Sequence, residues 1–180
     1  MRLNDVFHVI RAAHGSTGAR RFFIIGSQSI LGAYPDAPRS LTASFEVDLA
    51  FSDYQLAIEV DGSLGELSPF HDTHGYFGHG VTEDAAILPK DWKSRKKIIV
   101  HPELCDVEIT FLHPHDAVYS KLAAGREKDF EWVKETFRLR LANQGQVAQL
   151  ITQCDDSDLK QKLERNFLIA TGKKVEDFPG

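Results

Sequence analysis

Two acidic residues, Glu46 and Asp48, are separated by one position in a stretch where apolar side chains alternate with other ones. A period of two is typical of a β-strand with one buried face, so both carboxylates project from the opposite face, their Cβ atoms roughly 7 Å apart. Carboxylate oxygens are hard ligands that divalent cations prefer. The spacing predicts a metal-binding pair that takes Mg²⁺ or Mn²⁺; the alternative is a strand that merely presents two acids to solvent.

A third carboxylate is expected from a later strand. Glu108 lies between two apolar residues of a predicted strand, and Asp106 is the alternative. Three carboxylates on neighbouring strands would hold one or two Mg²⁺ ions, which orient a triphosphate for in-line displacement at phosphorus. The predicted metal ligands are therefore Glu46, Asp48 and Glu108.

A Gly-Ser pair, Gly26 and Ser27, follows the short, mostly apolar run 21–25. A run of this length that stops at a glycine is typical of a buried strand. Serine is a good N-cap, so we expect a helix over residues 27–34, whose start offers backbone N–H groups and a hydroxyl to a phosphate. Gly26 and Ser27 are therefore predicted to bind nucleotide phosphates, with a simple tight turn as the alternative.

The remaining pattern predicts a small mixed sheet followed by helices. The expected elements are a helix over 3–13, strands over 21–25, 45–51, 96–100 and 106–112, and loops or weak edge structure over the Gly-, Ser- and His-rich stretch 62–80. Beyond Pro114, apolar side chains recur at helical spacing in four stripes. We therefore expect an α/β (α+β) protein, with a sheet-containing core over residues 1–112 and a C-terminal helical bundle over 113–180 packed on that core.

Composition and charge exclude several classes of protein. The chain has 180 residues, is 42% hydrophobic and 26% charged, and its 26 acidic and 21 basic side chains leave a net charge of −5. These values exclude disordered and collagen-like chains, and the acidic total argues against a generic nucleic-acid binder. No apolar run reaches the ~18 residues of a membrane span, and two cysteines are too few for a disulfide framework, so we expect a soluble cytoplasmic protein.

The acidic excess is confined to one part of the chain. Residues 1–112 carry 10 basic and 15 acidic side chains, whereas residues 113–180 carry 11 of each. The densest basic run, five cations between Lys90 and Lys97, interrupts the acidic part. A local acceptor site for a tRNA-like molecule therefore stays compatible with the negative total.

The Gly-Ser turn and the acidic pair together resemble the signature of the nucleotidyltransferase superfamily, which has the DNA polymerase β-like fold. The run Ser120–Asp129 is similar to the Ser-Lys-Leu-x-Ala-x-Arg-x-Lys-Asp segment of its AbiEii-type branch, and Asp84–Arg95 resembles a segment of relatives of unknown function. The resemblance spans roughly residues 20–135. It implies transfer of a nucleotide from an NTP to an RNA, protein or small-molecule acceptor, and a relation to toxins that have a cognate antitoxin.

The same resemblance implies roles for three residues of the helical part. Lys121 and Asp129 match the lysine and aspartate of the AbiEii-type active site, and Arg126 is the candidate for a nucleotide contact. Lys121 lies at the edge of a predicted apolar helix face, from which its ammonium would place a point charge on the triphosphate. The alternative is a solvated helix face laced with salt bridges.

One departure from the family pattern bears on activity. The first acidic position, usually Asp, is Glu46 here, which keeps the charge but moves it by one methylene. The leading hypothesis is an active nucleotidyltransferase, and the alternative is a catalytically inactive module of the same fold that binds nucleotide or a partner protein. A zinc site built from His71, His74 and His79 is not expected, because no paired cysteines accompany them.

Overall fold

The computed structural model describes residues 1–101 and 103–178, leaving out the side chain of Cys105. The chain divides into two compact units. Met1–Ala86 and Lys96–Leu112 form the first unit, and Ile87–Arg95 joins His113 and the residues after it in the second. The segment 87–95, which the sequence analysis assigns to the sheet-containing part, thus belongs with the C-terminal helices.

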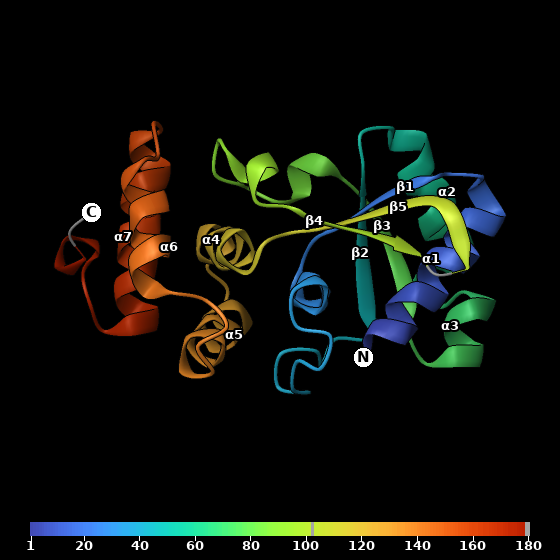
Figure 1. Ribbon diagram of the computed structural model, residues 1–180, viewed down its shortest axis with the longest axis horizontal. Coiled ribbons are helices and arrows are strands. Elements are labelled where there is room, and N and C mark those ends of the chain that lie inside the picture. Colours follow the sequence, from blue (N-terminus) through green and yellow to red (C-terminus); the bar gives the residue numbers. More distant parts are fainter. Residues whose placement is uncertain (102, 179–180) are drawn as a thin grey trace. The chain divides into compact units, whose positions relative to one another are not determined.

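In its described residues, the first unit is built on a five-stranded mixed sheet with the strand order β3-β2-β1-β5-β4 (Figure 1). β1 (Arg21–Ile24) is antiparallel to β2 (Glu46–Phe51) and parallel to β5 (Leu104–Phe111). β3 (Phe77–Thr82) runs parallel to β2 at one edge, and β4 (Lys97–His101) runs antiparallel to β5 at the other. The expected mixed sheet is confirmed, and β3, at its edge, was expected only as loops or weak edge structure.

The stretch 62–80, expected to be loops or weak edge structure, contains two helix segments and the edge strand β3. α2 (Tyr54–Leu64) is capped by Asp53, and α3 (Pro69–His74) is capped by Ser68, each through a side chain that accepts a backbone N–H. The expectation of weak edge structure is confirmed by β3, which is the edge strand beside β2, whereas loops were wrong where α2 and α3 form. Two glycines of β3 stand where alternating apolar side chains would have marked a definite strand.

Those two glycines set how closely helices approach the sheet. A Cβ atom at Gly80 would lie 2.0 Å from the carbonyl oxygen of Ala57 in α2, and one at Gly78 would lie 2.8 Å from Val9 in α1 (Leu3–Thr17). Side chains at these positions would push the helices away from the strand. α1 and α2 therefore cover the face onto which the two glycines open, and residues of the other parity project from the opposite face.

The residues after Gly26 form a tighter turn than the α-helix expected over 27–34. Gly26 has a φ of +66°, and η1 (Ser27–Gly32) is a 3₁₀ helix of 6 residues. The hydroxyl of Ser29 donates to the carbonyl oxygen of Gly26 at 2.7 Å and holds the turn. So short a segment aligns few peptide dipoles, so any affinity of Gly26 and Ser27 for phosphate depends on local N–H groups and the serine hydroxyl.

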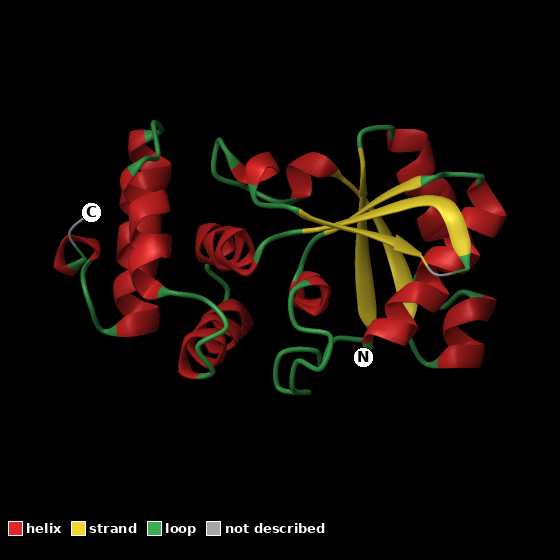
Figure 2. Cartoon of the chain, viewed as in Figure 1, coloured by secondary structure: helices red, strands yellow, loops and turns green. Residues whose placement is uncertain are grey.

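Within residues 87–95 and 113–178, the second unit contains four α-helices, and α4 packs against each of the other three (Figure 2). The helices are α4 (Pro114–Ala124), α5 (Glu127–Arg138), α6 (Gln144–Thr152) and α7 (Ser157–Thr171). Each predicted stripe contributes buried apolar side chains, among them Val118, Leu122, Val133, Val147, Ile151, Leu163 and Phe167. Tyr119, Ala123, Trp132 and Ala148, which lie outside the stripes, are buried as well. The predicted C-terminal helical bundle is confirmed.

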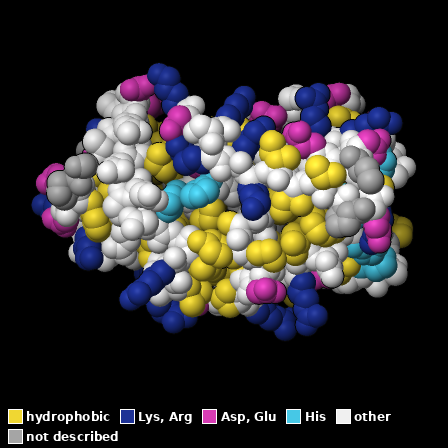
Figure 3. All heavy atoms as spheres, in the orientation of Figure 1, with side chains coloured by type: hydrophobic (Ala, Val, Ile, Leu, Met, Phe, Trp, Pro, Cys, Tyr) yellow, Lys and Arg dark blue, Asp and Glu magenta, His cyan; other side chains and the backbone are white. Residues whose placement is uncertain are grey.

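Figure 3 shows how the charged side chains of the described residues are distributed on the face that it draws. Lysine and arginine side chains lie scattered there and are interspersed with acidic ones. This distribution agrees with the modest net charge of −5. Among the described residues, no helix combines the length and the apolar character that crossing a bilayer requires.

Two glycine substitutions test the packing of α2 against β3. Gly80→Ala is expected to lower the free energy of unfolding by about 2–3 kcal/mol, because the added methyl group collides with backbone rather than with a movable side chain. Gly62→Ala, in α2 with nothing within 4 Å of the new methyl group, should instead raise it by about 0.5–1 kcal/mol. Urea unfolding followed by circular dichroism measures both, and equal effects would contradict the packing.

Candidate metal and nucleotide site

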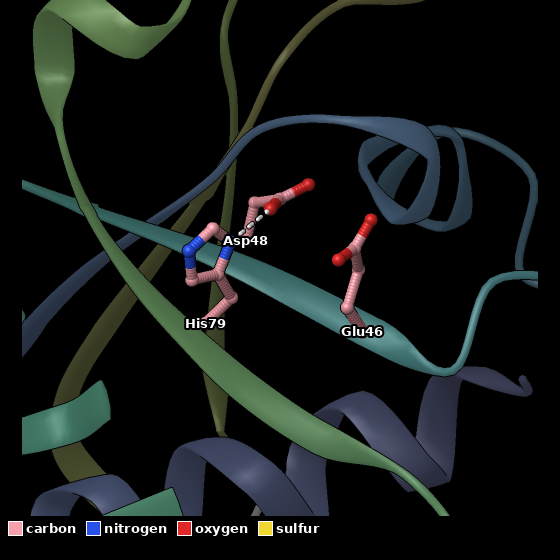
Figure 4. A group of neighbouring side chains, drawn as sticks. All are labelled: Glu46, Asp48 and His79. Carbon is pink, nitrogen blue, oxygen red and sulfur yellow. Dashed lines mark hydrogen bonds and ion pairs between the residues drawn. The ribbon is translucent and has the colours of Figure 1, made fainter. Parts of the chain in front are cut away.

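Three side chains with metal-binding atoms meet on the face of the sheet opposite α1 and α2. Glu46, Asp48 and His79 each offer one ligand atom, and these atoms all lie within 4.8 Å of one another (Figure 4). Glu46 and Asp48 share a face because they are two positions apart on β2. His79 joins them because the parallel register pairs it directly with Asp48. The predicted acidic pair thus lies as the alternation on β2 requires, with a histidine as its neighbour.

His79 was not among the predicted metal ligands. Its place in the sequence suggested a grouping only with His71 and His74, which belong to α3 rather than to the sheet. A weak signal was present, since Phe77, His79 and Val81 alternate with small residues. That signal could not show that β3 lies beside β2, because strand neighbours are set by contacts between distant segments.

Within the group, His79 and Asp48 interact through a hydrogen bond that becomes an ion pair when the imidazole is protonated. Nδ1 of His79 lies 3.2 Å from Oδ1 of Asp48, and this hydrogen bond raises the pKa of His79 above its ordinary value, against the opposing effect of burial. The negative charges of Asp48 and Glu46 raise the pKa further. Among the described residues, the Glu46 carboxylate has no hydrogen-bond or ion-pair partner. Its oxygens are free to bind a cation.

The Gly-Ser turn lies directly beside the acidic pair. A Cβ atom at Gly26 would lie 2.0 Å from Oδ2 of Asp48, and the backbone N–H of Ile25 donates to the carbonyl oxygen of Asp48 at 3.1 Å. Only glycine tolerates both this approach and a φ of +66°. Gly26 therefore borders the carboxylate of Asp48, and the partly buried Ser27 follows it in the chain, as in a phosphate-binding turn at this site.

The structure does not bring Glu108 to the pair. Glu108 on β5 pairs with Arg21, the first residue of β1. The carbonyl of Asp48 instead accepts a hydrogen bond from Ile25, which directly follows β1 and is four positions after Arg21. Four residues of a strand span about 13 Å. Asp106 lies beyond Glu108 on β5 and pairs with Arg20 at 3.2 Å. The expected third carboxylate is thus placed too far along the sheet, and His79 occupies the neighbouring position instead.

The residues that resemble the AbiEii active site form an ion cluster inside the helical unit. Asp129 is fully buried, and its Oδ1 accepts a hydrogen bond from Nζ of Lys121 at 3.1 Å. Its Oδ2 accepts bonds from Nε of Arg126 at 2.7 Å and from the backbone N–H of the same residue at 3.3 Å. The carboxylate thereby caps α5, and Nζ of Lys121 lies 5.0 Å from the centre of the Trp132 ring.

The charge of Asp129 depends on this cluster. Burial by itself raises the pKa of a carboxyl group, but the hydrogen bonds and positive charges of Arg126 and Lys121 outweigh it and hold the pKa of Asp129 below its ordinary value. Both carboxylate oxygens are occupied by donors. Asp129 is therefore suited to holding two cations in place, and less suited to binding a metal ion itself.

Comparison with known proteins identifies the family of the chain. A protein-family model described as nucleotidyltransferase of unknown function (DUF6036) matches residues 1–176. The chain belongs to this family. No curated protein and no solved structure matches it significantly. Nucleotidyltransferases generally use divalent metals, and the carboxylates of Glu46 and Asp48 beside the imidazole of His79 fit such an ion.

The helical unit of this nucleotidyltransferase-family protein also contains a polar pocket of about 380 Å³. It is lined by Asp91, Arg95, His113, His115, Gln146, Gln149, Leu150 and Gln153. Nη2 of Arg95 donates to Oδ1 of the buried Asp116 at 2.6 Å, and the guanidinium also contacts Asp91. Arg95 is thus neutralised, and the basic run between Lys90 and Lys97 presents fewer free cations than the sequence suggests.

Asp129→Asn tests the charge cluster of the helical unit. The substitution leaves Lys121 and Arg126 without their buried counter-charge, and we expect the free energy of unfolding to fall by about 3 kcal/mol. Glu131→Gln, on the same helix in an exposed pair with Lys134, should change it by less than about 0.5 kcal/mol. Urea unfolding measures both variants, and a small effect of Asp129→Asn would show that the cluster is not a stabilising one.

His115 provides a test of burial by pH. Desolvation, aided by the positive charges of His113 and Arg95, lowers its pKa to about 4, and its Nε2 accepts the backbone N–H of Asn143 at 2.9 Å. The pKa of His115 is lower in the folded than in the unfolded chain, so the unfolded chain takes up the proton first as the pH falls. The stability that the neutral, buried imidazole provides is therefore complete above about pH 6.5 and is lost as the pH falls towards 4. Titration of its ring protons by NMR should show a midpoint near 4, and a midpoint near 6.5 would contradict the burial.

Proposed function

We propose that the protein is a metal-dependent nucleotidyltransferase that moves a nucleoside monophosphate from an NTP to a hydroxyl group of an acceptor. The observation that carries the proposal is the convergence of Glu46, Asp48 and His79 within 4.8 Å, beside Gly26, in a chain of a nucleotidyltransferase family. Carboxylates with free oxygens next to a turn that tolerates close backbone approach are what a metal–triphosphate complex requires.

In this proposal the two carboxylates and the turn divide the work. Glu46 and Asp48 hold the divalent ion, which when bound neutralises charge on the triphosphate. The backbone at Gly26 and the hydroxyl of Ser27 orient the phosphates next to it. The acceptor oxygen then forms a bond to the α-phosphorus while the bond from that phosphorus to pyrophosphate breaks. Pyrophosphate leaves with the electron pair, and the hydroxyl proton passes to solvent.

Lys121, Asp129 and Arg126 enter the proposal through the resemblance to AbiEii-type proteins. Lys121 would add positive charge to the triphosphate, and Arg126, whose side chain is 62% exposed, would contact the nucleotide. Asp129 would act as a positioning residue, because its carboxylate holds both cations. The support for these roles is the similarity of the run Ser120–Asp129 together with the ion cluster that it forms.

The acceptor is proposed by class. RNA, including tRNA, a protein or a small molecule each offers the required hydroxyl group. The similarity to AbiEii-type toxins supports an acceptor whose modification arrests growth, with an antitoxin as the partner that prevents it. Neutralisation of Arg95 by Asp116 and Asp91 weakens the case for the run between Lys90 and Lys97 as an RNA-binding patch.

A labelled-nucleotide transfer assay tests the proposal. Each α-labelled NTP is incubated with the protein, Mg²⁺ or Mn²⁺, and total RNA, total protein or small-molecule acceptors. We expect label to appear in one acceptor class, and Asp48→Asn or Glu46→Gln to lower the rate by about 100-fold or more, because either change removes a ligand charge. Glu46→Asp, which restores the usual residue, should retain or raise the rate.

Glu59→Gln on α2 is the matched control, since it removes an exposed carboxylate of the same unit and should leave the rate unchanged. Transfer that persists in Asp48→Asn would contradict the metal site. Binding of an NTP without transfer to any acceptor would favour the alternative of an inactive nucleotide-binding module.

Expression in a bacterial host tests the relation to toxins, because the wild-type chain should slow growth and the Asp48→Asn chain should not.

A further inference from the structure

His79 distinguishes this candidate site from one made of carboxylates alone. The imidazole lies on the neighbouring strand at the position paired with Asp48, and its Nδ1 is 3.2 Å from Oδ1 of that residue (Figure 4). Two ligands held at right angles about 2.1 Å from one ion would lie about 3.0 Å apart. The separation of nitrogen and oxygen is therefore close to that of two adjacent ligands of a single ion.

The strand that carries His79, β3, is fixed by close contacts with α1 and α2 on the opposite face of the sheet. On the opposite face of β3, Gly80 packs against the carbonyl of Ala57, and Gly78 packs against Val9. Neither contact leaves room for the strand to shift by a residue or to approach the helices further. The direction of the His79 side chain is thus set by packing that does not depend on Asp48.

The two carboxylates are available to the same ion. Among the described residues, no lysine or arginine pairs with Glu46 or Asp48, and His79 is the one side chain that contacts either of them through an ion pair. Both carboxylates are partly buried, which strengthens their attraction for a cation relative to exposed acids. The group therefore offers two anionic oxygens and one nitrogen, all within 4.8 Å of one another.

We propose that His79 is a nitrogen ligand of the catalytic ion and that it makes the site prefer Mn²⁺, a first-row transition ion, over Mg²⁺. The proposal rests on the proposed function for the role of the ion, and on the geometry for its identity. Mg²⁺ takes oxygen ligands almost exclusively and requires a near-ideal octahedron. An imidazole nitrogen instead favours transition ions, and carboxylates accept Mn²⁺ as readily as Mg²⁺.

Direct metal binding to the full-length protein, stripped of metal, tests the proposal. Titration calorimetry should give a dissociation constant at least about tenfold lower for Mn²⁺ than for Mg²⁺. Pulsed electron paramagnetic resonance of the Mn²⁺ complex should show modulation from a directly bound ¹⁴N nucleus. In His79→Gln the ¹⁴N signal should disappear and the Mn²⁺ dissociation constant should rise about tenfold or more, with a change of less than about twofold for Mg²⁺.

Two further variants keep the test decisive. His74→Gln removes an exposed imidazole of α3 in the same unit and should leave the ¹⁴N signal and both affinities unchanged. His79→Asp replaces the nitrogen by a third carboxylate, and should lower the preference for Mn²⁺ over Mg²⁺ while retaining binding of both ions. This second variant also answers the case in which His79→Gln does not fold.

Failure of this inference and failure of the proposed function give different results. A Mn²⁺ complex without ¹⁴N modulation, or one whose affinity is unchanged in His79→Gln, would overturn the role of His79 even if nucleotide transfer is observed. The residue would then be only the ion-pair partner of Asp48. A ¹⁴N-coordinated Mn²⁺ ion in a protein that transfers no nucleotide would leave the ligand assignment standing and overturn the proposed activity.

Discussion

The parallel pairing of β2 with β3 is the constraint on which the candidate metal site depends. Its register places His79 opposite Asp48, and a shift of one residue would turn every side chain of β3 to the other face. Such a shift would direct His79 towards α2, where the carbonyl of Ala57 leaves no space even for a methyl group at Gly80. The packing of Gly78 and Gly80 against the helices on one face of the sheet thereby determines that His79 lies beside Asp48 on the other face.

A second close approach fixes the other side of the site. Gly26 reaches Asp48 because it has no Cβ, and its φ of +66° turns the chain from β1 into η1 beside the acidic pair. The bond from the N–H of Ile25 to the carbonyl of Asp48 ties the end of β1 to β2. The end of β1, the start of η1 and β2 thus lie close together at Asp48, and this close approach requires glycine at position 26.

In the helical unit, the sequence resemblance suggests a catalytic role for Asp129, whereas its contacts indicate a structural role. Asp129 lies in a run that resembles a segment of AbiEii-type proteins, and its two oxygens accept hydrogen bonds from Lys121 and Arg126 while it caps α5. A buried carboxylate must be compensated by donors. Both descriptions apply if the aspartate acts by holding the lysine, which is the role that we propose for it.

Much of the fold followed from local patterns. The stripes of α4 to α7 were read correctly because helical periodicity is contained in a few turns of chain, and Glu46 and Asp48 were placed on one face because alternation is a property of a single strand. β3 was expected only as loops or weak edge structure because Gly78 and Gly80 removed the apolar signal, and those glycines are required by Val9 and Ala57, which are distant in the sequence.

The sequence by itself thus determined the class of fold, the shared face of the acidic pair and the presence of a Gly-Ser turn after β1, since each follows from patterns within single segments of the chain. Only the tertiary structure decided which third side chain joins the pair. Glu108 has the expected chemistry but lies on β5 opposite Arg21, four positions along the sheet from Ile25, whereas His79 lies on the strand next to β2 in direct register with Asp48. Register between strands arises from packing among distant segments, and no local pattern of residue types contains it.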